Sequence, residues 1–450
     1  MNFFDVVVVG GGPAGLSFST EFKQLYPDKS VLVIRGNVKP EVPCGVPYVF
    51  NTISPEKNLL PEPYGKFGVF LVVDDVLKVD VNDKKVFTKK NNVFFYDKLV
   101  LATGSKPRKL AVFDGVDGIF YVYKNFEYAS FLKKKFEEAK NVVLLGGGFI
   151  GVEFADEFSK SKDKNIILVE RGSHILNHIL DFDVSEKVKK VLEENNVSVL
   201  TNAFVKNVVL HENSNKIKGF VLNDGSFLYA DFVLVGIGAE PNVDLAFNSD
   251  IPVVDGFVFV DDYQRTKVKD VFAIGDCAFK KNFLTGKPSN ILLATTAVVE
   301  GRFLAHNIYN VSFFRKVKGV IPTSGTVVGN LFISSTGITE EDALKENFSF
   351  FSSSILVDDK HPCSLPEDHK IFLKAIFSSS GVILGAQILG YNTDKVGEMV
   401  NLVNVLLENN MSVFDIVNLQ LASHPKLHSS PVHYPLIQVA LDVIKKMNRN

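Results

Sequence analysis

The chain has 450 residues, of which 49 are basic and 51 are acidic, so its formal net charge is only −2. This balance provides no electrostatic footprint for nucleic acid, and the length is sufficient for about three domains. No apolar run reaches the roughly 18 residues that a membrane-spanning helix requires, so no membrane partner is expected. Three cysteines are too few for a disulfide framework, which favours a reducing cytoplasmic compartment over secretion.

The first predicted element is a strand of mostly β-branched residues over 4–9, typical of a parallel sheet that is buried on both faces. A glycine loop follows, and its residues are Gly10, Gly11, Gly12, Pro13, Ala14 and Gly15. A helical pattern then covers 16–25. In this order of elements Gly10 permits a tight turn, Gly12 lets the backbone approach a pyrophosphate, and Gly15 lets helix and strand pack closely. The pattern predicts a dinucleotide-binding loop.

The next predicted strand, 30–34, ends at Arg35, where a ribose-binding acid is expected in such a fold. Arg35 is compatible with two arrangements. It can bind the 2′-phosphate of NADP, or it can lie against an adenine ring or a phosphate while another group holds the ribose.

A reactive sulfur is predicted in the segment 42–48, which contains Pro43, Cys44, Gly45 and Pro47. A thiol is nucleophilic as the thiolate, and positive charge, a helix N-terminus or an electron-poor partner such as an oxidised flavin favours that form. The two prolines and Gly45 restrict the backbone around the sulfur. The alternative is a small, buried, apolar cysteine in a turn.

Short apolar segments between 67 and 95 alternate with Asp, Lys and Asn clusters and predict a β-meander. It continues into a strand that ends at the small residues Ala102, Thr103 and Gly104. At that turn the backbone either approaches a cofactor or makes a plain strand end.

A second strand, glycine loop and helix begins with the strand 141–145. Its loop glycines are Gly146, Gly148 and Gly151. The next strand, 165–169, ends at Glu170, the position of an acid that binds the 2′-hydroxyl of an NAD ribose. Repulsion of a 2′-phosphate by Glu170 favours NADH over NADPH, although Arg171 is adjacent. A further strand closes this domain near Gly238. Two such patterns in one chain predict two bound dinucleotides.

Another predicted strand, 271–274, ends at Gly275 and Asp276. Asp276 either accepts hydrogen bonds from a polyol or caps the helix that follows it. Residues 294–307, which include Ala297, have the small-residue, amphipathic pattern of a helix packed close to a ligand.

The C-terminal part, from about residue 319, contains further predicted strands and a helix capped by Thr339, with Asp342 in its first turn. Two strands are expected at 372–376 and 382–390, around a Ser-rich turn. No metal-ligand spacing and no Ser, His and Asp arrangement for nucleophilic catalysis is found in the sequence. Cys277 and Cys363 lie in no motif that would activate a thiol, so structural roles are expected for them.

The order of these motifs along nearly the whole chain resembles the FAD-dependent pyridine nucleotide-disulfide oxidoreductases. Within them it is similar to the single-cysteine branch, which contains coenzyme A-disulfide reductases, NADH oxidases and peroxidases, and coenzyme A persulfide or polysulfide reductases. The resemblance implies an α/β fold with two Rossmann-like three-layer dinucleotide-binding domains, glutathione-reductase-like, plus a C-terminal α+β dimerisation domain. The implied domains are 1–108 with 239–315 for FAD, 109–238 for NAD, and 316–450 for the interface of a homodimer.

The resemblance also implies a division of cofactors between the two glycine loops. FAD takes the first loop, with Asp276 on its ribityl chain and Arg35 on the FAD side, and NADH takes the second. Phe149 is then a ring that covers the flavin until nicotinamide displaces it, and Glu153 is an acid near the nicotinamide. The full set of implied cofactor-binding residues is Gly10, Gly12, Pro13, Ala14, Gly15, Arg35, Ala102, Thr103, Gly104, Gly146, Gly148, Phe149, Ile150, Gly151, Glu153, Glu170, Gly238, Gly275, Asp276 and Ala297.

The segment around His424 resembles the His-Pro segment by which two-cysteine reductases send a general acid and base into the partner subunit's site. The pKa of histidine lies near working pH, so it suits protonation of a departing thiolate. Lys426 stands where that segment usually has Thr. The alternative for His424 is an interface or surface histidine.

Two-cysteine members of the family carry a second cysteine five positions after the first, but Val49 occupies that position. Cys44 therefore has no internal partner there, and its oxidised form must be a mixed disulfide, a persulfide or a sulfenic acid. The histidine that NADH oxidases and peroxidases of the branch carry in the first loop is replaced by the Pro13 and Ala14 region. The tyrosines with which coenzyme A-disulfide reductases aid thiol release are absent around 361–364.

The sequence thus predicts that NADH reduces a flavin and that the electrons pass through Cys44 to a low-molecular-weight disulfide, persulfide or polysulfide. In a second hypothesis the protein is an NADH oxidase or an electron donor to a small redox protein, and Cys44 only tunes the flavin. In a third it is a non-enzymatic flavoprotein that responds to NADH.

Overall fold

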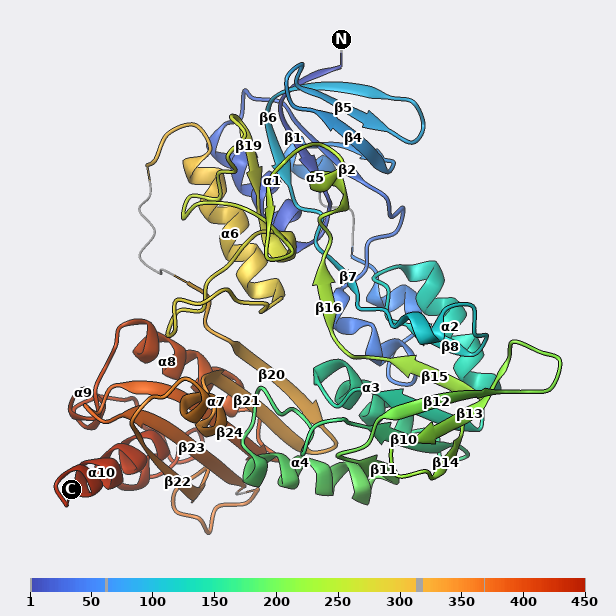
Figure 1. Cartoon of the computed structure of the whole chain (residues 1–450). Coiled ribbons are helices and arrows are strands. Elements are labelled where there is room, and N and C mark those ends of the chain that lie inside the picture. The colour runs from blue at the N-terminus through green and yellow to red at the C-terminus, as the bar shows by residue number, and fades with distance from the viewer. Residues whose placement is uncertain (1, 61–63, 313–318, 368, 450) are drawn as a thin grey trace. The chain divides into compact units, whose positions relative to one another are not determined.

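The computed structural model describes residues 2–60, 64–312, 319–367 and 369–449 (Figure 1). The chain divides into two compact units. The first consists of Met1–Lys109, Val122–Lys134 and Gly238–Val320, and the second of Leu110–Tyr121, Lys135–Ile237 and Ile321–Asn450. The bounds given above for three domains remain a prediction.

The first unit contains a seven-stranded sheet. Its strands in spatial order are β3 (Phe70–Val73), β2 (Val31–Arg35), β1 (Phe3–Val9), β6 (Val93–Leu101), β5 (Lys85–Thr88) and β4 (Val76–Asp80), and β19 (Val271–Ala273) also pairs with β6. Strands β3, β2, β1, β6 and β19 run parallel, whereas β5 and β4 are antiparallel to their neighbours. The loops after β1, β2, β6 and β19 therefore leave the same edge of the sheet, where ligands bind in folds of this type.

Both faces of this sheet are buried, which explains the continuous apolar run in β1. Val6 and Val8 join a core with helices α1 (Pro13–Leu25) and α6 (Ala294–Asn307). Val7 and Val9 point to the opposite face and join a second core that includes residues of β4 and β5. Helices α1 and α6 approach closely at Gly301, where a Cβ would lie 2.6 Å from the Ala14 carbonyl oxygen.

The predicted meander is correct in part. Strands β4, β5 and β6 form an antiparallel meander, but β3 joins the parallel edge beside β2. The remaining elements of the first unit are the pairs β7 (Ser105–Pro107) with β16 (Ala239–Pro241) and β17 (Val253–Val254) with β18 (Phe257–Val258), and the short helix α5 (Asp244–Phe247). Helix α2 (Phe126–Glu138) contributes its first two turns to this unit.

The second unit contains a five-stranded parallel sheet of the dinucleotide-binding type. Its order is β11 (Val197–Leu200), β10 (Asn165–Val169), β9 (Asn141–Leu145), β15 (Phe232–Val235) and β8 (Ile119–Tyr121). Helices α3 (Phe149–Ser159) and α4 (Phe182–Glu194) and a three-stranded antiparallel sheet of β12 (Val205–Leu210), β13 (Ile217–Leu222) and β14 (Phe227–Tyr229) complete this part.

The same unit contains a five-stranded antiparallel sheet formed by the C-terminal part of the chain. Its order is β20 (Thr323–Val328), β21 (Leu331–Gly337), β24 (Ile383–Tyr391), β23 (Lys370–Ser378) and β22 (Phe350–Asp358). The accompanying helices are α7 (Glu340–Lys345), α8 (Val396–Glu408), α9 (Val413–Val417) and α10 (Pro435–Met447). The two predicted strands around the Ser-rich turn are confirmed as β23 and β24. The Thr339 cap is also confirmed, because its hydroxyl accepts a hydrogen bond from Asp342 N at 3.0 Å.

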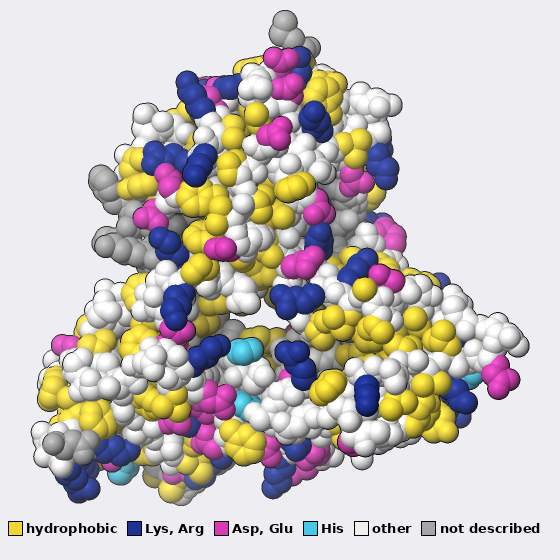
Figure 2. All heavy atoms as spheres, in the orientation of Figure 1, with side chains coloured by type: hydrophobic (Ala, Val, Ile, Leu, Met, Phe, Trp, Pro, Cys, Tyr) yellow, Lys and Arg dark blue, Asp and Glu magenta, His cyan; other side chains and the backbone are white. Residues whose placement is uncertain are grey.

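Charged side chains of both signs are interspersed on the displayed face of the molecule, in keeping with the near-balanced composition (Figure 2). Lys374 on β23 is among the cations that are buried instead. Its Nζ lies 2.8 Å from Asp183, 2.9 Å from Glu340 and 3.1 Å from Asp181. Burial alone would lower the pKa of Lys374, but these carboxylates raise it above its ordinary value. Lys374 therefore links the C-terminal sheet to α4 of the parallel-sheet part.

We predict that Lys374→Met strongly destabilises the protein, because it leaves the buried carboxylate of Asp181 without its cation. Removing one partner of a buried ion pair costs about 3 to 5 kcal/mol. Lys370 on the same strand pairs with Asp358 at the surface, so Lys370→Met should cost less than about 1 kcal/mol. Urea unfolding midpoints for the three proteins test this prediction, and equal shifts for the two variants would contradict it.

Candidate active site

The first glycine loop joins β1 to α1 with almost no room for side chains. Gly10 has φ +114°, and a Cβ there would lie 2.0 Å from the Ala102 carbonyl oxygen. A Cβ on Gly15 would lie 2.0 Å from the Gly10 carbonyl oxygen. Gly12, the N-cap of α1, has no atom within 4 Å of its Cβ position and is exposed. Pro13 begins the helix and Ala14 is buried behind it. The loop therefore leaves backbone N–H groups at the helix N-terminus open to an anion.

Arg35, at the end of β2, lies against this loop. Its Cδ is 2.9 Å from the Cβ position of Gly11, and its guanidinium lies over the ring of Tyr64 at 5.7 Å. The Tyr64 hydroxyl donates to the Gly11 carbonyl oxygen at 3.3 Å. Arg35 is only 7% exposed, so it places a mostly buried positive charge beside the loop, where a phosphate or an adenine ring suits it better than a ribose hydroxyl does.

The turns after β6 and β19 meet the same loop. Gly275 has φ +75°, and a Cβ on it would lie 2.8 Å from the Ala14 Cβ and 3.6 Å from the Ala297 Cβ. Asp276 accepts a hydrogen bond from the Ser105 hydroxyl at 2.7 Å. The structure excludes the role of Asp276 as a cap of the following helix, because α6 begins only at Ala294, with Leu293 as its N-cap.

Thr103 and Gly104 hold the end of β6. The Thr103 hydroxyl donates to the Asn242 carbonyl oxygen at 2.6 Å, and Gly104 has φ +71°. The structure thus brings together Gly10, Gly12, Pro13, Ala14, Gly15, Arg35, Ala102, Gly275 and Ala297 around one edge of the sheet.

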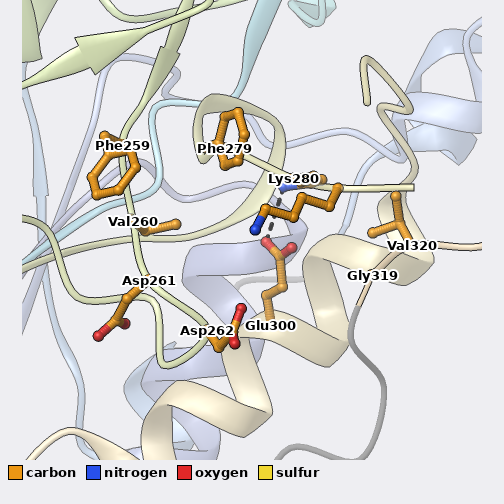
Figure 3. A pocket seen from close by; sticks show the side chains of 10 residues that line it. Phe259, Val260, Asp261, Asp262, Phe279, Lys280, Glu300, Gly319 and Val320 are labelled. Atoms are coloured by element: carbon orange, nitrogen blue, oxygen red, sulfur yellow. Dashed lines mark hydrogen bonds and ion pairs between the residues drawn. The ribbon is translucent and has the colours of Figure 1, made fainter. Parts of the chain in front are cut away.

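A buried ion pair supports the Gly275 turn, and no sequence motif indicated it. Glu300 on α6 accepts from Gly275 N at 2.8 Å, and Lys280 Nζ donates to the Gly275 carbonyl oxygen at 2.5 Å and to Glu300 at 3.1 Å. Both side chains are 2% exposed. They form part of the wall of a pocket of about 270 Å³, with Lys280 directed at the Glu300 carboxylate (Figure 3). A local pattern could not reveal this pair because its members lie on separate elements.

The Cys44 segment forms two short turns, η1 (Pro43–Gly45) and η2 (Pro47–Val49). Cys44 is exposed, so the alternative of a buried structural cysteine is wrong. Buried Asn58 fixes the segment, since its Nδ2 donates to the Val42 carbonyl oxygen at 3.1 Å and its Oδ1 lies 1.9 Å from the Cβ position of Gly45. No other residue than glycine fits at position 45 without displacing Asn58.

The other two cysteines differ from each other. Cys277 is fully buried, and burial raises the pKa of its thiol, so a structural role is supported. Cys363 is exposed, and no packing explains it. Cys277 is not placed to serve as a second redox cysteine, because its thiol is inaccessible.

The second glycine loop repeats the geometry of the first. Gly146 has φ +105°, a Cβ on Gly151 would lie 1.8 Å from the Gly146 carbonyl oxygen, and Gly148 has no atom within 4 Å of its Cβ position. Glu170 accepts hydrogen bonds from Gly147 N at 2.6 Å and from Gly172 N. Its carboxylate is therefore held at the end of β10 beside the loop. Phe149 and Ile150 form the first turn of α3, and Gly238 follows β15 with φ +98°.

Glu153, one turn into α3, accepts a hydrogen bond from the Thr326 hydroxyl at 2.8 Å. Burial raises the pKa of Glu153, while the Thr326 hydrogen bond opposes that shift. Thr326 lies on β20 of the C-terminal sheet, and no sequence motif indicated this contact.

His424 is exposed in the segment after α9, and its Nδ1 accepts from Lys426 N at 3.3 Å. Cys44 and His424 belong to different units. In the described ranges, no group of His, Cys, Asp and Glu side chains has the geometry of a metal site, and none of the helices combines the length and apolar character needed to cross a membrane.

Two loops of this kind, with an exposed cysteine in the same unit as the first, define a two-dinucleotide oxidoreductase. The family model for "Pyridine nucleotide-disulphide oxidoreductase" matches residues 4–301, and the dimerisation-domain model of that family matches residues 323–434. The chain belongs to the pyridine nucleotide-disulphide oxidoreductase family.

Relatives match nearly the whole chain. An NADH oxidase of Methanocaldococcus jannaschii is 28% identical over 459 residues, covering 98% of this chain and 99% of the relative. A CoA-dependent NAD(P)H sulfur oxidoreductase of Pyrococcus abyssi is 28% identical over 449 residues, covering 97% of each chain. The solved NAD-dependent persulfide reductase from A. fulgidus superposes with a TM-score of 0.89 at 27% identity, covering 99% of this chain and 84% of that one.

These findings confirm the predicted class, fold and cofactors. The protein is an oxidoreductase that uses FAD and NADH, with two dinucleotide-binding domains and a dimerisation domain. The third hypothesis, a non-enzymatic flavoprotein, has no support among these relatives. The two loops fit their cofactors, because each leaves an open helix N-terminus against which a pyrophosphate can lie.

We predict that Lys280→Met weakens FAD retention, because it removes the cation that neutralises Glu300 and donates to the Gly275 carbonyl oxygen. An orphaned buried carboxylate costs about 3 to 5 kcal/mol. Lys281 lines the same pocket but is exposed, so Lys281→Met is the matched control. The measurement is the ratio of flavin to protein absorbance after dialysis, and equal retention in the two variants would contradict the prediction.

Proposed function

We propose that this protein reduces low-molecular-weight sulfur compounds with NADH, and that Cys44 is the residue that exchanges with them. The acceptor class is a thiol disulfide, a persulfide or a polysulfide, as in coenzyme A-disulfide reductases. The observation that carries the proposal is the exposed Cys44 thiol, with Cys277 inaccessible and Val49 where a resolving cysteine would lie. Because Val49 stands in place of a second cysteine, Cys44 is proposed to form its disulfide with an external sulfur.

The residues of the first unit are proposed to hold FAD. The N–H groups after Gly12 would receive the pyrophosphate, Arg35 would lie against a phosphate or the adenine, and Asp276 would accept hydrogen bonds from ribityl hydroxyls. Ser105 already orients the Asp276 carboxylate. Bound FAD would supply the two-electron exchange between NADH and sulfur that side chains alone cannot perform.

In the second unit, Glu170 is proposed to bind the hydroxyls of the NADH ribose. Phe149 and Glu153 begin the helix whose N-terminus would receive the NADH pyrophosphate. Thr326 fixes the direction of the Glu153 carboxyl group. The carboxyl group would therefore meet the nicotinamide end in one orientation.

The sulfur chemistry is an exchange followed by reduction. The Cys44 thiolate attacks one sulfur of the acceptor, a Cys44–sulfur bond forms, and the other half of the acceptor leaves as a thiolate. Two electrons from NADH then cleave the new bond and restore the Cys44 thiolate. For a disulfide the sum is NADH, one proton and RSSR giving NAD⁺ and two RSH. His424 from the partner subunit of a homodimer is proposed to protonate the departing thiolate.

The homodimer is part of the proposal and is supported by the dimerisation-domain match. Apolar side chains of the C-terminal part are also exposed in the isolated chain. They include Leu356, Phe414, Leu427 and Val432, which are 57%, 53%, 59% and 71% exposed. Such side chains are suited to burial against a second copy.

The M. jannaschii relative favours a second candidate function, an NADH oxidase. In that case oxygen is the acceptor and Cys44 is not the exchange residue. The rubredoxin reductase of Pseudomonas putida, 29% identical over 314 residues and covering 68% of this chain and 80% of the relative, represents the related case of a small redox protein as acceptor.

NADH consumption by wild type, Cys44→Ser and Cys363→Ser separates these functions. With coenzyme A disulfide, coenzyme A persulfide or polysulfide as acceptor, Cys44→Ser should lose at least about a thousandfold in rate, because the nucleophile is gone. Cys363→Ser, the other exposed thiol, should stay within about twofold. Full activity of Cys44→Ser with sulfur acceptors would refute the proposal, and fast turnover with oxygen alone would establish the oxidase.

Nucleotide preference is tested at Glu170. Glu170→Gln removes the charge that binds the ribose hydroxyls and repels a 2′-phosphate, so kcat/KM for NADH should fall about tenfold while that for NADPH rises. Arg171 is exposed beside it, and Arg171→Gln should instead lower only the activity with NADPH. Unchanged NADH to NADPH ratios in Glu170→Gln would show that another group selects the nucleotide.

A further inference from the structure

Glu41 is a buried carboxyl group on the segment that carries Cys44. It is 7% exposed and pairs through its backbone with Leu59. Its Oε1 is buried without a hydrogen-bond partner, and within the described part of the chain no cation forms an ion pair with it. A buried carboxylate without a partner is costly, so this group is held in its neutral form more readily than an exposed Glu.

Helix α2 lies close to this carboxyl group. Lys39, two residues before Glu41, lies over the Phe126 ring at 4.5 Å, and Glu127 occupies the first turn of α2. Burial, and then the charge of Glu127, raise the pKa of Glu41 to about 7. The charged residues of the segment and of the elements next to it are Lys39 in the segment itself, Glu127 and Lys133 on α2, and Glu56 and Lys57 on η3 (Pro55–Asn58).

Glu41 and Cys44 belong to one short segment of backbone. Three peptide units separate the residues, so their Cα atoms are at most about 11 Å apart. At an effective dielectric constant of about 20, a unit charge about 11 Å from a second group changes its ionisation equilibrium about tenfold, and the factor falls as the two charged atoms lie further apart. Salt screens such a buried charge much less than it screens surface charges.

We propose that Glu41 is a positioning residue that acts through Cys44 by its charge. The thiolate form of Cys44 is most favoured while the Glu41 carboxyl group keeps its proton and is neutral. The coupling is reciprocal, so formation of the thiolate also increases the affinity of Glu41 for a proton. Near neutral pH, the release of a Cys44 thiolate is then accompanied by proton uptake at Glu41. The role of this proton in catalytic turnover rests on the proposed function. The electrostatic coupling of Glu41 and Cys44 does not rest on it.

The test is the pH dependence of Cys44 alkylation by iodoacetamide in the full-length FAD-loaded protein after reduction with dithiothreitol. Peptide mass spectrometry follows Cys44 and Cys363 in one sample, and Cys363 serves as the internal control. Wild type and Glu41→Gln should react equally at Cys44 below about pH 6, where Glu41 is neutral in wild type. At about pH 8, Glu41→Gln should react about tenfold faster, because wild type then carries the opposing charge. Superimposable Cys44 profiles would overturn the proposal.

Glu127→Gln provides a second variant at an exposed position of α2. Without the Glu127 charge, Glu41 should lose its proton at lower pH, so the bend in the Cys44 profile should move to lower pH as well. If the bend in the Cys44 alkylation profile stays at the same pH, it belongs to the titration of another group, and the proposal is overturned. This variant keeps the test available if Glu41→Gln does not fold.

Alkylation needs neither NADH nor a sulfur acceptor. If Cys44→Ser retains sulfur reduction, the proposed function fails while a shifted profile in Glu41→Gln still establishes the coupling. If the profiles superimpose while Cys44→Ser is inactive, the proposed function stands and the inference about Glu41 fails.

Discussion

The close approach of backbone to backbone at the two glycine loops is the constraint on which the rest of the structure depends. At Gly15 and at Gly151 a Cβ would lie within 2.0 Å of the carbonyl oxygen of the loop's first glycine. Helix and strand can pack this closely only with glycine at both positions. The packing aims the first N–H groups of α1 and α3 outward, so each unit presents an anion-binding helix end. Arg35 and Glu170, at the ends of β2 and β10, then give the two loops opposite charge.

Much of this was predictable from the sequence because the loop motifs are local. A strand, three glycines at fixed spacing and a helix follow one another in the chain, so Gly10 to Gly15 and Gly146 to Gly151 could be assigned without coordinates. The position of Glu170 beside the second loop could be predicted because Glu170 ends the next strand. The edge strand β3 was misjudged, because the choice between a meander and a parallel edge depends on pairing with β2, which no local pattern encodes.

The supporting contacts could not be predicted for the same reason. Lys280 meets Glu300, Asn58 meets Gly45, and Thr326 meets Glu153, each across separate elements of the fold. A lysine followed much later by a glutamate has no periodicity to detect. Only burial identifies these contacts as important, because a buried polar group requires a partner.

The buried charges of this protein fall into two kinds, and the difference bears on Cys44. Lys280 and Lys374 are matched by carboxylates within about hydrogen-bonding distance, so each buried cation has a counter-charge. Glu41 has no such partner, and its charge can therefore change near neutral pH. The structure thus has paired charges at the Gly275 turn and between the two sheets of the second unit, but a variable charge on the segment with the exposed thiol. A cysteine that must accept foreign sulfur and then release it alternates between neutral and anionic forms. A neighbouring group that gains or loses a proton as the cysteine changes its charge suits both forms of the cysteine. A permanent ion pair would favour either the neutral or the anionic form throughout the cycle.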